Sequence, residues 1–231
     1  MPDPTIALER LQRQVIACRK CPSLRRYCEK IAREKRRAYR DWEYWGRPNP
    51  SFGDPAAELL ILGLAPAAHG GNRTGRMFTG DRSGDFLYGA LYRAGFASQP
   101  TSRHRDDGLT LTNAYITAVL RCAPPKNKPR PGELANCRPY LERELELLPN
   151  VRAVLALGQI AFSNYLRLLR DKGAIASRSA YHFAHGAEYE LPPPLPRLFA
   201  SYHPSQQNTQ TGRLTEAMLD SVLARIRRFL G

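Results

Sequence analysis

Two kinds of hydrophobic pattern alternate along the chain, one typical of strands covered on both faces and the other of amphipathic helices. Nearly continuous apolar runs predict four strands, at 58–64, within 109–120, at 151–158 and at 197–202. Apolar residues at helical spacing predict helices at 5–17, 23–40, 83–94, 132–148, 159–170 and along a stripe from 214 to 229. Because strands and helices alternate, we expect an α/β fold of three layers, with helices on both faces of a central, mainly parallel, four-stranded sheet.

Three unusual loops follow predicted strands. GLAPAAHG follows the first strand, RCAPPKNKP the second and YHPSQQNTQTG the fourth. The stretch WEYWGRPNPSFGDP should be irregular, as should 171–196, with a hairpin expected within HGAEYELPPPLP. In a parallel sheet the ligand crevice lies beyond the carboxyl ends of the strands. We therefore expect the functional site where the three loops meet.

The charge of the chain narrows the class of partner. The formal net charge is +14 and the pI is about 10.0, which favours a polyanionic partner, with nucleic acid first. The excess is uneven, because residues 1–50 hold 13 Lys and Arg against 6 Asp and Glu. Basic amphipathic helices with large apolar faces are absent from the sequence pattern, so a membrane surface is the weaker expectation.

Targeting and domain signals are few. The chain has no apolar run approaching the ~20 residues that span a bilayer, and its first residues lack the pattern of a secretory signal. We expect a cytoplasmic protein in which residues 1–231 form a single domain. Within it, residues 1–50 should form a basic helical segment.

The five cysteines suggest a metal centre. Cys18 and Cys21 have C-x-x-C spacing, and Cys122 and Cys137 follow later in the chain. Four thiolates could hold a 4Fe–4S cluster or a structural zinc ion, and the spacing does not choose between them. Cys28 falls outside this set and is expected to be a core thiol.

Three long segments together resemble the motifs of one known family. They are GLAPAAHGGNRTGRMFTGD at 63–81, RCAPPKNKP at 121–129 and SYHPSQQNTQTGRLT at 201–215. They look like the first motif, the central loop with the third cluster cysteine, and the second motif of the family 5, or type b, uracil-DNA glycosylases. The order of the four cysteines fits as well, and the resemblance spans about residues 10–230. Ala67 departs from the pattern, since the family commonly has Gly there, and we expect its methyl group to affect substrate preference more than the reaction.

The resemblance implies a function. The chain should adopt the uracil-DNA glycosylase-like fold and act as a monomeric, iron–sulfur-containing repair enzyme. It should flip uracil out of double- or single-stranded DNA and hydrolyse its N-glycosidic bond, leaving an abasic site. Hypoxanthine, xanthine and modified cytosines are expected as further substrates, because GLAPAA carries no acidic or amide side chain and indicates a permissive pocket.

The motifs also suggest roles for individual residues. Phe78 is expected to stack on the flipped base, and His203 to donate a hydrogen bond to the departing base. Asp81 should stabilise the sugar cation and orient water, although an Asp before a predicted helix is also a typical N-cap. Asn127 is a further catalytic candidate and otherwise a turn residue. The remaining residues expected at the substrate belong to the first motif and are Gly63, Ala65, Ala67 and His69.

Several readings stay open. A family 4 glycosylase restricted to uracil is the rival enzyme, and a non-catalytic metal-containing DNA-binding protein is the rival from another class. A small-molecule hydrolase of the α/β type is disfavoured because the G-x-S-x-G motif is missing. Arg73 and Arg76 could contact phosphate or pair with Asp81. The run REKRRAYR at 33–40 is either a solvated helix face or a contact to the DNA backbone.

Overall fold

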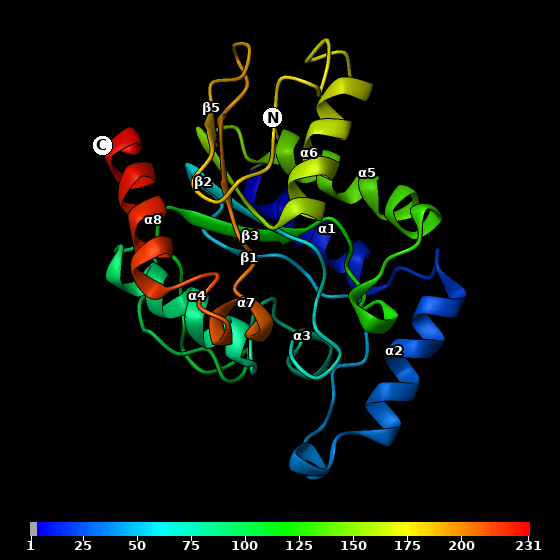
Figure 1. The fold of residues 1–231 in the computed structure, drawn as a ribbon. Coiled ribbons are helices and arrows are strands. Elements are labelled where there is room, and N and C mark those ends of the chain that lie inside the picture. The colour runs from blue at the N-terminus through cyan, green and yellow to red at the C-terminus, as the bar shows by residue number, and fades with distance from the viewer. Residues whose placement is uncertain (1–3) are drawn as a thin grey trace.

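The structure, a computed structural model, describes residues 4–231 as one six-stranded sheet with helices on both faces (Figure 1). The strands are β1 (Phe52–Gly53), β2 (Leu59–Gly63), β3 (Ala114–Ala118), β4 (Ala153–Leu157), β5 (Glu188–Tyr189) and β6 (Arg197–Ser201). The helices are α1 (Pro4–Ile16), α2 (Pro22–Glu34), α3 (Gly71–Thr74), α4 (Arg82–Arg93), α5 (Pro131–Leu147), α6 (Gln159–Asp171), α7 (Gln206–Gln210) and α8 (Glu216–Leu230). Two short 3-10 turns complete the described elements, η1 (Arg37–Tyr39) and η2 (Pro125–Asn127).

The sheet has the order β1-β3-β2-β4-β6-β5. Its four central strands are parallel and are the four predicted from the sequence. The predicted count of four was wrong, because β1 and β5 pair antiparallel at the two edges. Each edge strand has only two residues, too few for an alternating pattern to stand out. β5 lies within the expected hairpin, and it pairs with the strand that follows.

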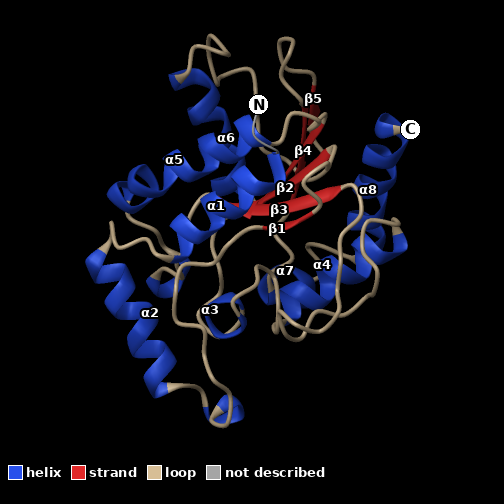
Figure 2. Cartoon of the chain, turned by 180° about the vertical axis from the view of Figure 1, so that it is seen from behind, coloured by secondary structure: helices blue, strands red, loops and turns tan. Residues whose placement is uncertain are grey.

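The core lies on both faces of the central strands. In β2, Leu59 and Ile61 belong to the cluster that packs beneath α4 and α8, while Leu60 and Leu62 belong to the cluster beneath α5 and α6. Every residue of β2, β3 and β4 is buried, as expected for strands covered on both sides. The view from behind in Figure 2 shows the same three layers. The predicted α/β class and three-layer architecture are therefore confirmed.

The second helix is shorter than predicted. It ends at Glu34 and not near residue 40, because Lys35 takes a left-handed conformation with φ of 54°. The Lys35 backbone N–H donates to the Ile31 carbonyl, and its Nζ donates to the Arg40 carbonyl 2.9 Å away. These hydrogen bonds terminate α2 at this point, and η1 follows as a separate turn. Short helices also form inside two of the predicted loops, as α3 and α7.

A buried carboxylate joins the N-terminal segment to the sheet. Glu144 is fully buried and accepts hydrogen bonds from Gln12 Nε2 at 2.8 Å and from the hydroxyls of Ser51 and Thr117 at 2.6 Å. The Arg121 guanidinium forms an ion pair with the same carboxylate. The network connects α1, β3 and α5 with the loop that carries Cys122. Within residues 4–231, helices that are long and apolar enough to cross a membrane are absent.

Candidate functional site

The strand order creates a switch point between β2 and β4. The chain moves from β2 to β3 on one side and from β4 to β6 on the other, and crevices form at the carboxyl ends of strands where the order reverses in this way. A glycine stands at each of the two strand ends. Gly63 is the last residue of β2, and Gly158 follows β4 with φ of +94°.

Phe78 and His203 meet over these two glycines. The Phe78 ring leaves no room for a Cβ at Gly63, since one would lie 2.9 Å from its Cζ. A Cβ at Gly158 would lie 3.3 Å from His203 Cβ. The centroids of the phenyl and imidazole rings are 5.7 Å apart, with 31° between the planes. Phe78 has φ of 51°, and a bulky residue with positive φ marks local strain of the kind that occurs at functional sites.

Burial keeps the His203 side chain neutral. It lowers the pKa of the imidazole to about 4, from an ordinary value of 6.5. The Asn208 amide donates to the His203 backbone carbonyl at 2.9 Å and fixes the start of the loop after β6. At neutral pH the imidazole therefore offers one N–H donor and one acceptor nitrogen.

The two oxygens of Asp81 have different surroundings. Oδ1 accepts the backbone N–H of Gly84 at 3.0 Å and caps α4, as expected from the sequence. Oδ2 lies against the backbone of Gly70, where a Cβ would collide with it. Burial raises the pKa of the Asp81 carboxyl, while the N–H groups of Gly84 and Ser83 counteract part of that rise. One oxygen is thus structural, and the other faces the loop of the first motif.

Arg73 joins the two ends of that loop. Its Nε donates to the His69 carbonyl at 2.8 Å, and its Nη2 donates to the Gly80 carbonyl, next to Asp81. The guanidinium carbon lies 3.9 Å from the Tyr39 ring centroid and 4.1 Å from that of Trp42, two rings of the N-terminal segment whose planes are 75° apart. Cation–π contacts with two rings support a buried guanidinium. The sequence pattern suggested a phosphate contact or an Asp81 partner, and it did not reveal this clamp.

Arg76 has a structural position. It is buried, and its Nη2 pairs with both carboxylate oxygens of Asp107 at 2.8 Å. Further donors of the same guanidinium reach Thr79 and Ser102. The expectation that Arg76 contacts phosphate or pairs with Asp81 was therefore wrong, because its guanidinium N–H groups are bonded to residues inside the protein.

The other predicted residues of the first motif lie around this core. The His69 Nδ1 shares a hydrogen bond of 3.1 Å with the Tyr44 hydroxyl, and burial lowers the pKa of the imidazole. Ala65 and Ala67 are half-buried, and the Ala67 carbonyl accepts the backbone N–H groups of Gly70 and Asn72. The Ala67 methyl group lies on the same side as Gly70, near the Asp81 carboxylate.

Asn127 lies on the exposed turn η2, beyond the carboxyl end of β3. Its backbone is left-handed, with φ of 56°, and so is that of Lys126. Asn127 is thus on the side of the sheet that carries Phe78 and His203. Within the described chain its side chain forms no hydrogen bond.

The four predicted cysteine ligands line one cavity. Cys18 and Cys21 come from the segment between α1 and α2, Cys122 from the loop after β3 and Cys137 from α5. The Cys137 sulfur accepts the backbone N–H of Arg121 at 3.3 Å, and the Cys21 sulfur accepts the Asn136 amide at 3.5 Å.

The donor set of this cavity suits a thiolate-bound group. Cys122 and Cys137 are buried, and burial raises the pKa of the Cys137 thiol to about 12. Four soft thiol ligands fit an iron–sulfur cluster or zinc. Cys28 is buried beside the cavity, and its thiol donates to the Ala123 carbonyl at 3.5 Å. Across residues 4–231, groups of three His, Cys, Asp or Glu side chains close enough to hold one metal ion are absent.

Comparison with known proteins identifies the family. The model of the uracil DNA glycosylase superfamily matches residues 50–227. The chain belongs to this superfamily. It is 53% identical to the type-5 uracil-DNA glycosylase of Thermus thermophilus over 93% of this chain and 94% of that protein. It is 50% identical to the type-5 uracil-DNA glycosylase of Mycobacterium bovis over 94% of this chain and 80% of that protein.

These relatives place the chain in the type-5 family of uracil-DNA glycosylases, which confirms the resemblance found in its motifs. A type-4 uracil-DNA glycosylase of Archaeoglobus fulgidus is only 27% identical, over 86% of this chain and 82% of that protein. The superfamily model begins at residue 50, after Cys18 and Cys21, whereas the type-5 relatives match nearly the whole chain. In this glycosylase, the sequence pattern missed Gly158 and the clamping role of Arg73. Gly158 could have been found from the sequence as a lone glycine after an apolar strand. The contacts of Arg73 had no local signal in the sequence.

Proposed function

We propose that this type-5 family member removes uracil from DNA by hydrolysing the N-glycosidic bond, leaving an abasic site. The observation that carries the proposal is the meeting of Phe78 and His203 at the switch point of the sheet, with Asp81 on the adjoining loop. A base within duplex DNA is out of reach of such a site, so the nucleotide must be extruded before it can react.

Phe78 and His203 would recognise the extruded base. The phenyl ring offers an apolar stacking surface, and the neutral imidazole offers an N–H. Because the two rings already contact each other, the base would lie against Phe78 with its edge toward His203. Negative charge develops on the base as the bond breaks, and a fixed donor aimed at that charge lowers the barrier, as in an oxyanion hole.

Asp81 would stabilise the other fragment. The sugar becomes cation-like as the base departs, and Oδ2 is the oxygen that the helix cap leaves available. Unit charges ~4 Å apart at an effective dielectric of ~20 attract by ~4 kcal/mol, a gross figure equivalent to roughly a thousandfold in rate. The same oxygen can accept a proton from the attacking water. Asn127 would assist from η2, at the base edge or the water.

We propose that the pocket also accepts hypoxanthine, xanthine and modified cytosines. The loop of the first motif presents the small side chains of Ala65 and Ala67. Donors or acceptors that would select the uracil edge are absent from these side chains. A site without such groups discriminates weakly among bases of similar shape.

DNA binding would use the loops around the pocket. Their exposed cations form no ion pair with any residue in 4–231, namely Arg82, Arg103, Lys126, Lys128 and Arg213. Other arginines are paired, as Arg93 is with Asp220 and Arg138 with Asp171. Unpaired cations can neutralise DNA phosphates and release their counterions.

We propose that the cysteine cavity holds a 4Fe–4S cluster bound by Cys18, Cys21, Cys122 and Cys137. Such a cluster is held by four thiolates, and zinc is the alternative that the metal content must exclude. Its role would be structural, because it would fasten the N-terminal segment of a single domain to the loop after β3. The residues that act on DNA stand apart from the cavity lining.

The deciding experiment is incubation of the metal-replete protein with single and double strands containing uracil, hypoxanthine or xanthine. Alkaline cleavage of the products reveals abasic sites. We expect cleavage at uracil in both forms and at the other bases in duplexes. Cleavage at uracil alone would refute the broad pocket and favour a type-4-like specificity. Tight binding without any cleavage would indicate a non-catalytic DNA-binding protein and refute the proposed activity.

A further inference from the structure

The segment after α2 carries cations without partners. Arg36, Arg37 and Arg40 are exposed, and none of them forms an ion pair with a residue in 4–231. The preceding acid, Glu34, is engaged by Lys30 at 3.6 Å. Three guanidinium groups thus stand within five residues and lack an acidic partner in the described chain, unlike Arg93 on α4 and Arg138 on α5. We call residues 35–40 the basic arm.

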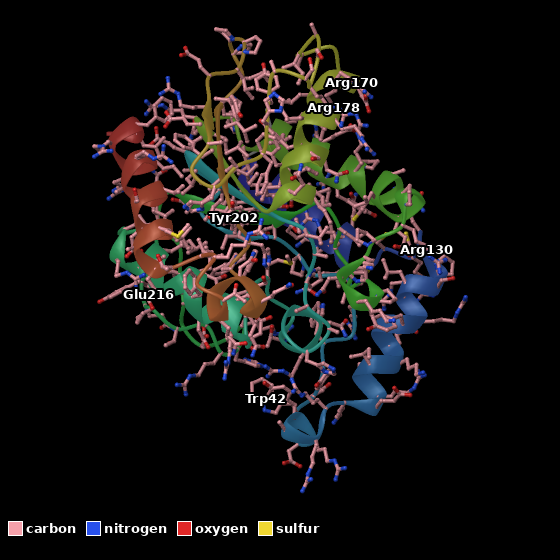
Figure 3. All side chains as sticks on the ribbon, in the orientation of Figure 1. Trp42, Arg130, Arg170, Arg178, Tyr202 and Glu216 are labelled. Carbon is pink, nitrogen blue, oxygen red and sulfur yellow. The ribbon has the colours of Figure 1, made fainter. Side chains whose placement is uncertain are left out.

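The basic arm projects from the body of the molecule. In Figure 1, α2 extends away from the sheet and η1 lies at its far end, on the side where α3 is found. Figure 3 places Trp42 close to this end, and Arg170 and Arg178 at the opposite end of the molecule. The arm is therefore on the side of the molecule that carries the loop of the first motif.

Several contacts fix the arm and the segment that follows it to that loop. The backbone N–H of Trp45 donates to the Arg73 carbonyl at 2.9 Å, and that of Gly46 donates to the Asn72 carbonyl at 3.0 Å. The Tyr44 hydroxyl joins the backbone N–H of Arg36, 3.3 Å away, to His69 Nδ1.

Arg73 links the arm directly to the neighbour of Asp81. Its guanidinium lies on Tyr39 of the arm and donates to the carbonyl of Gly80, the neighbour of Asp81. One buried side chain thus spans the distance from the arm to the loop of the pocket.

We propose that the basic arm binds the phosphates of the DNA strand next to the extruded nucleotide through Arg36, Arg37 and Arg40. Arg73 sets the arm at a fixed position relative to Asp81, so phosphate contacts made by the arm locate the lesion over the pocket. Charge complementarity selects the occupant, since DNA carries a regular row of anions and the arm a cluster of unpaired guanidinium groups. The inference rests on the proposed function and specifies its DNA contact.

The first test is the salt dependence of DNA binding. A variant carrying Arg36→Ala, Arg37→Ala and Arg40→Ala is compared with the parent on a uracil duplex with a non-hydrolysable 2′-fluoro sugar. Each lost phosphate contact lowers the slope of log Kd against log salt by ~0.9. We expect a slope lowered by more than about 1 and a Kd raised at least about tenfold at low salt.

A matched control separates direct contact from overall charge. Replacing Arg167, Arg170 and Arg178 by Ala removes the same charge from α6 and the segment after it, and Figure 3 places Arg170 and Arg178 at the end of the molecule opposite Trp42. We expect its slope to stay within about 0.3 of the parent. Equal losses in both triple variants would overturn the proposal, and so would an unchanged slope in the arm variant. A third variant, with Lys at positions 36, 37 and 40, should restore the slope.

Neutral phosphates map the contact itself. Duplexes carrying one methylphosphonate at successive positions around the uracil are bound to the parent and to the arm variant. We expect at least one position to weaken binding by the parent severalfold and to have no effect on the arm variant. Identical penalties in both proteins would overturn the inference while uracil removal by the parent stands. Absence of uracil removal by the parent would instead refute the proposed function.

Discussion

The ring centroids of Phe78 and His203 lie 5.7 Å apart, and each residue packs against a glycine at the end of one of two neighbouring parallel strands. The glycines are what allow this approach. With any side chain at Gly63 the phenyl ring would have to move, and with one at Gly158 the start of the loop after β6 would be displaced. The candidate site therefore depends on two missing Cβ atoms as much as on its functional groups.

Gly63→Ala should impair catalysis by moving Phe78. The new Cβ would lie 2.9 Å from the ring, closer than normal packing permits. We expect uracil release under single-turnover conditions to fall at least about tenfold. Gly132→Ala is the control, since no atom lies within 4 Å of a Cβ at that position. Full activity of Gly63→Ala would show that the position of Phe78 is unimportant for the reaction.

Asp81→Asn should separate helix capping from catalysis. Asn is as good an N-cap as Asp, so the thermal stability should change little, whereas Asp81→Ala should lose about 1 kcal/mol. Both variants lack the carboxylate, and we expect both to release uracil at least about tenfold more slowly, with DNA binding retained. Thr215→Ala removes the cap of α8 and tests the stability effect alone. Wild-type rates in Asp81→Asn would limit Asp81 to its capping role.

The pH dependence of the reaction should reflect Asp81 and not His203. Burial lowers the pKa of His203 to about 4, so the imidazole stays neutral as the pH falls from 7 to 5. Burial raises the pKa of Asp81, so its charge and the rate should be lost at a higher pH than for an ordinary carboxyl of pKa 3.8. His203→Asn should be at least about tenfold slower with the same acid limb. An acid limb near 6.5 that vanishes in this variant would contradict the neutral imidazole.

Substitution of the cavity cysteines should abolish the metal centre. We expect the purified protein to contain four iron and four sulfide per chain, with broad visible absorption that is lost in Cys122→Ser. Cys28→Ala is the matched control, because this thiol is equally buried but does not line the cavity. The control should keep its iron. Anaerobic protein with one zinc ion and no iron would refute the cluster.

Glu144→Gln should be one of the most destabilising single substitutions in the chain. The carboxylate is fully buried, and the Arg121 guanidinium pairs with it. Removing one charge of a buried pair leaves the other uncompensated, at a cost of about 3–5 kcal/mol. Chemical denaturation measures the change in the free energy of unfolding. A loss below about 1 kcal/mol would mean that the network is dispensable.

Local patterns in the sequence determined much of this protein. Continuous apolar runs specify strands buried on both faces, so the four parallel strands and the three layers could be read directly. The loops of the motifs, their glycines and the cysteine spacing also follow from residue type. An N-cap role for Asp81 could be anticipated, because capping is a local interaction between neighbouring residues.

Other features were decided only by the tertiary structure. The edge strands β1 and β5 exist because a neighbour is available to pair with, and two residues carry no pattern of their own. Arg73 and Arg76 are both arginines of one loop, yet aromatic rings from a distant segment contact the first, and Asp107 pairs with the second. The pairing of Phe78 with His203 likewise depends on which strands become neighbours. Contacts between residues far apart in the chain are set by packing, and sequence spacing carries no record of them.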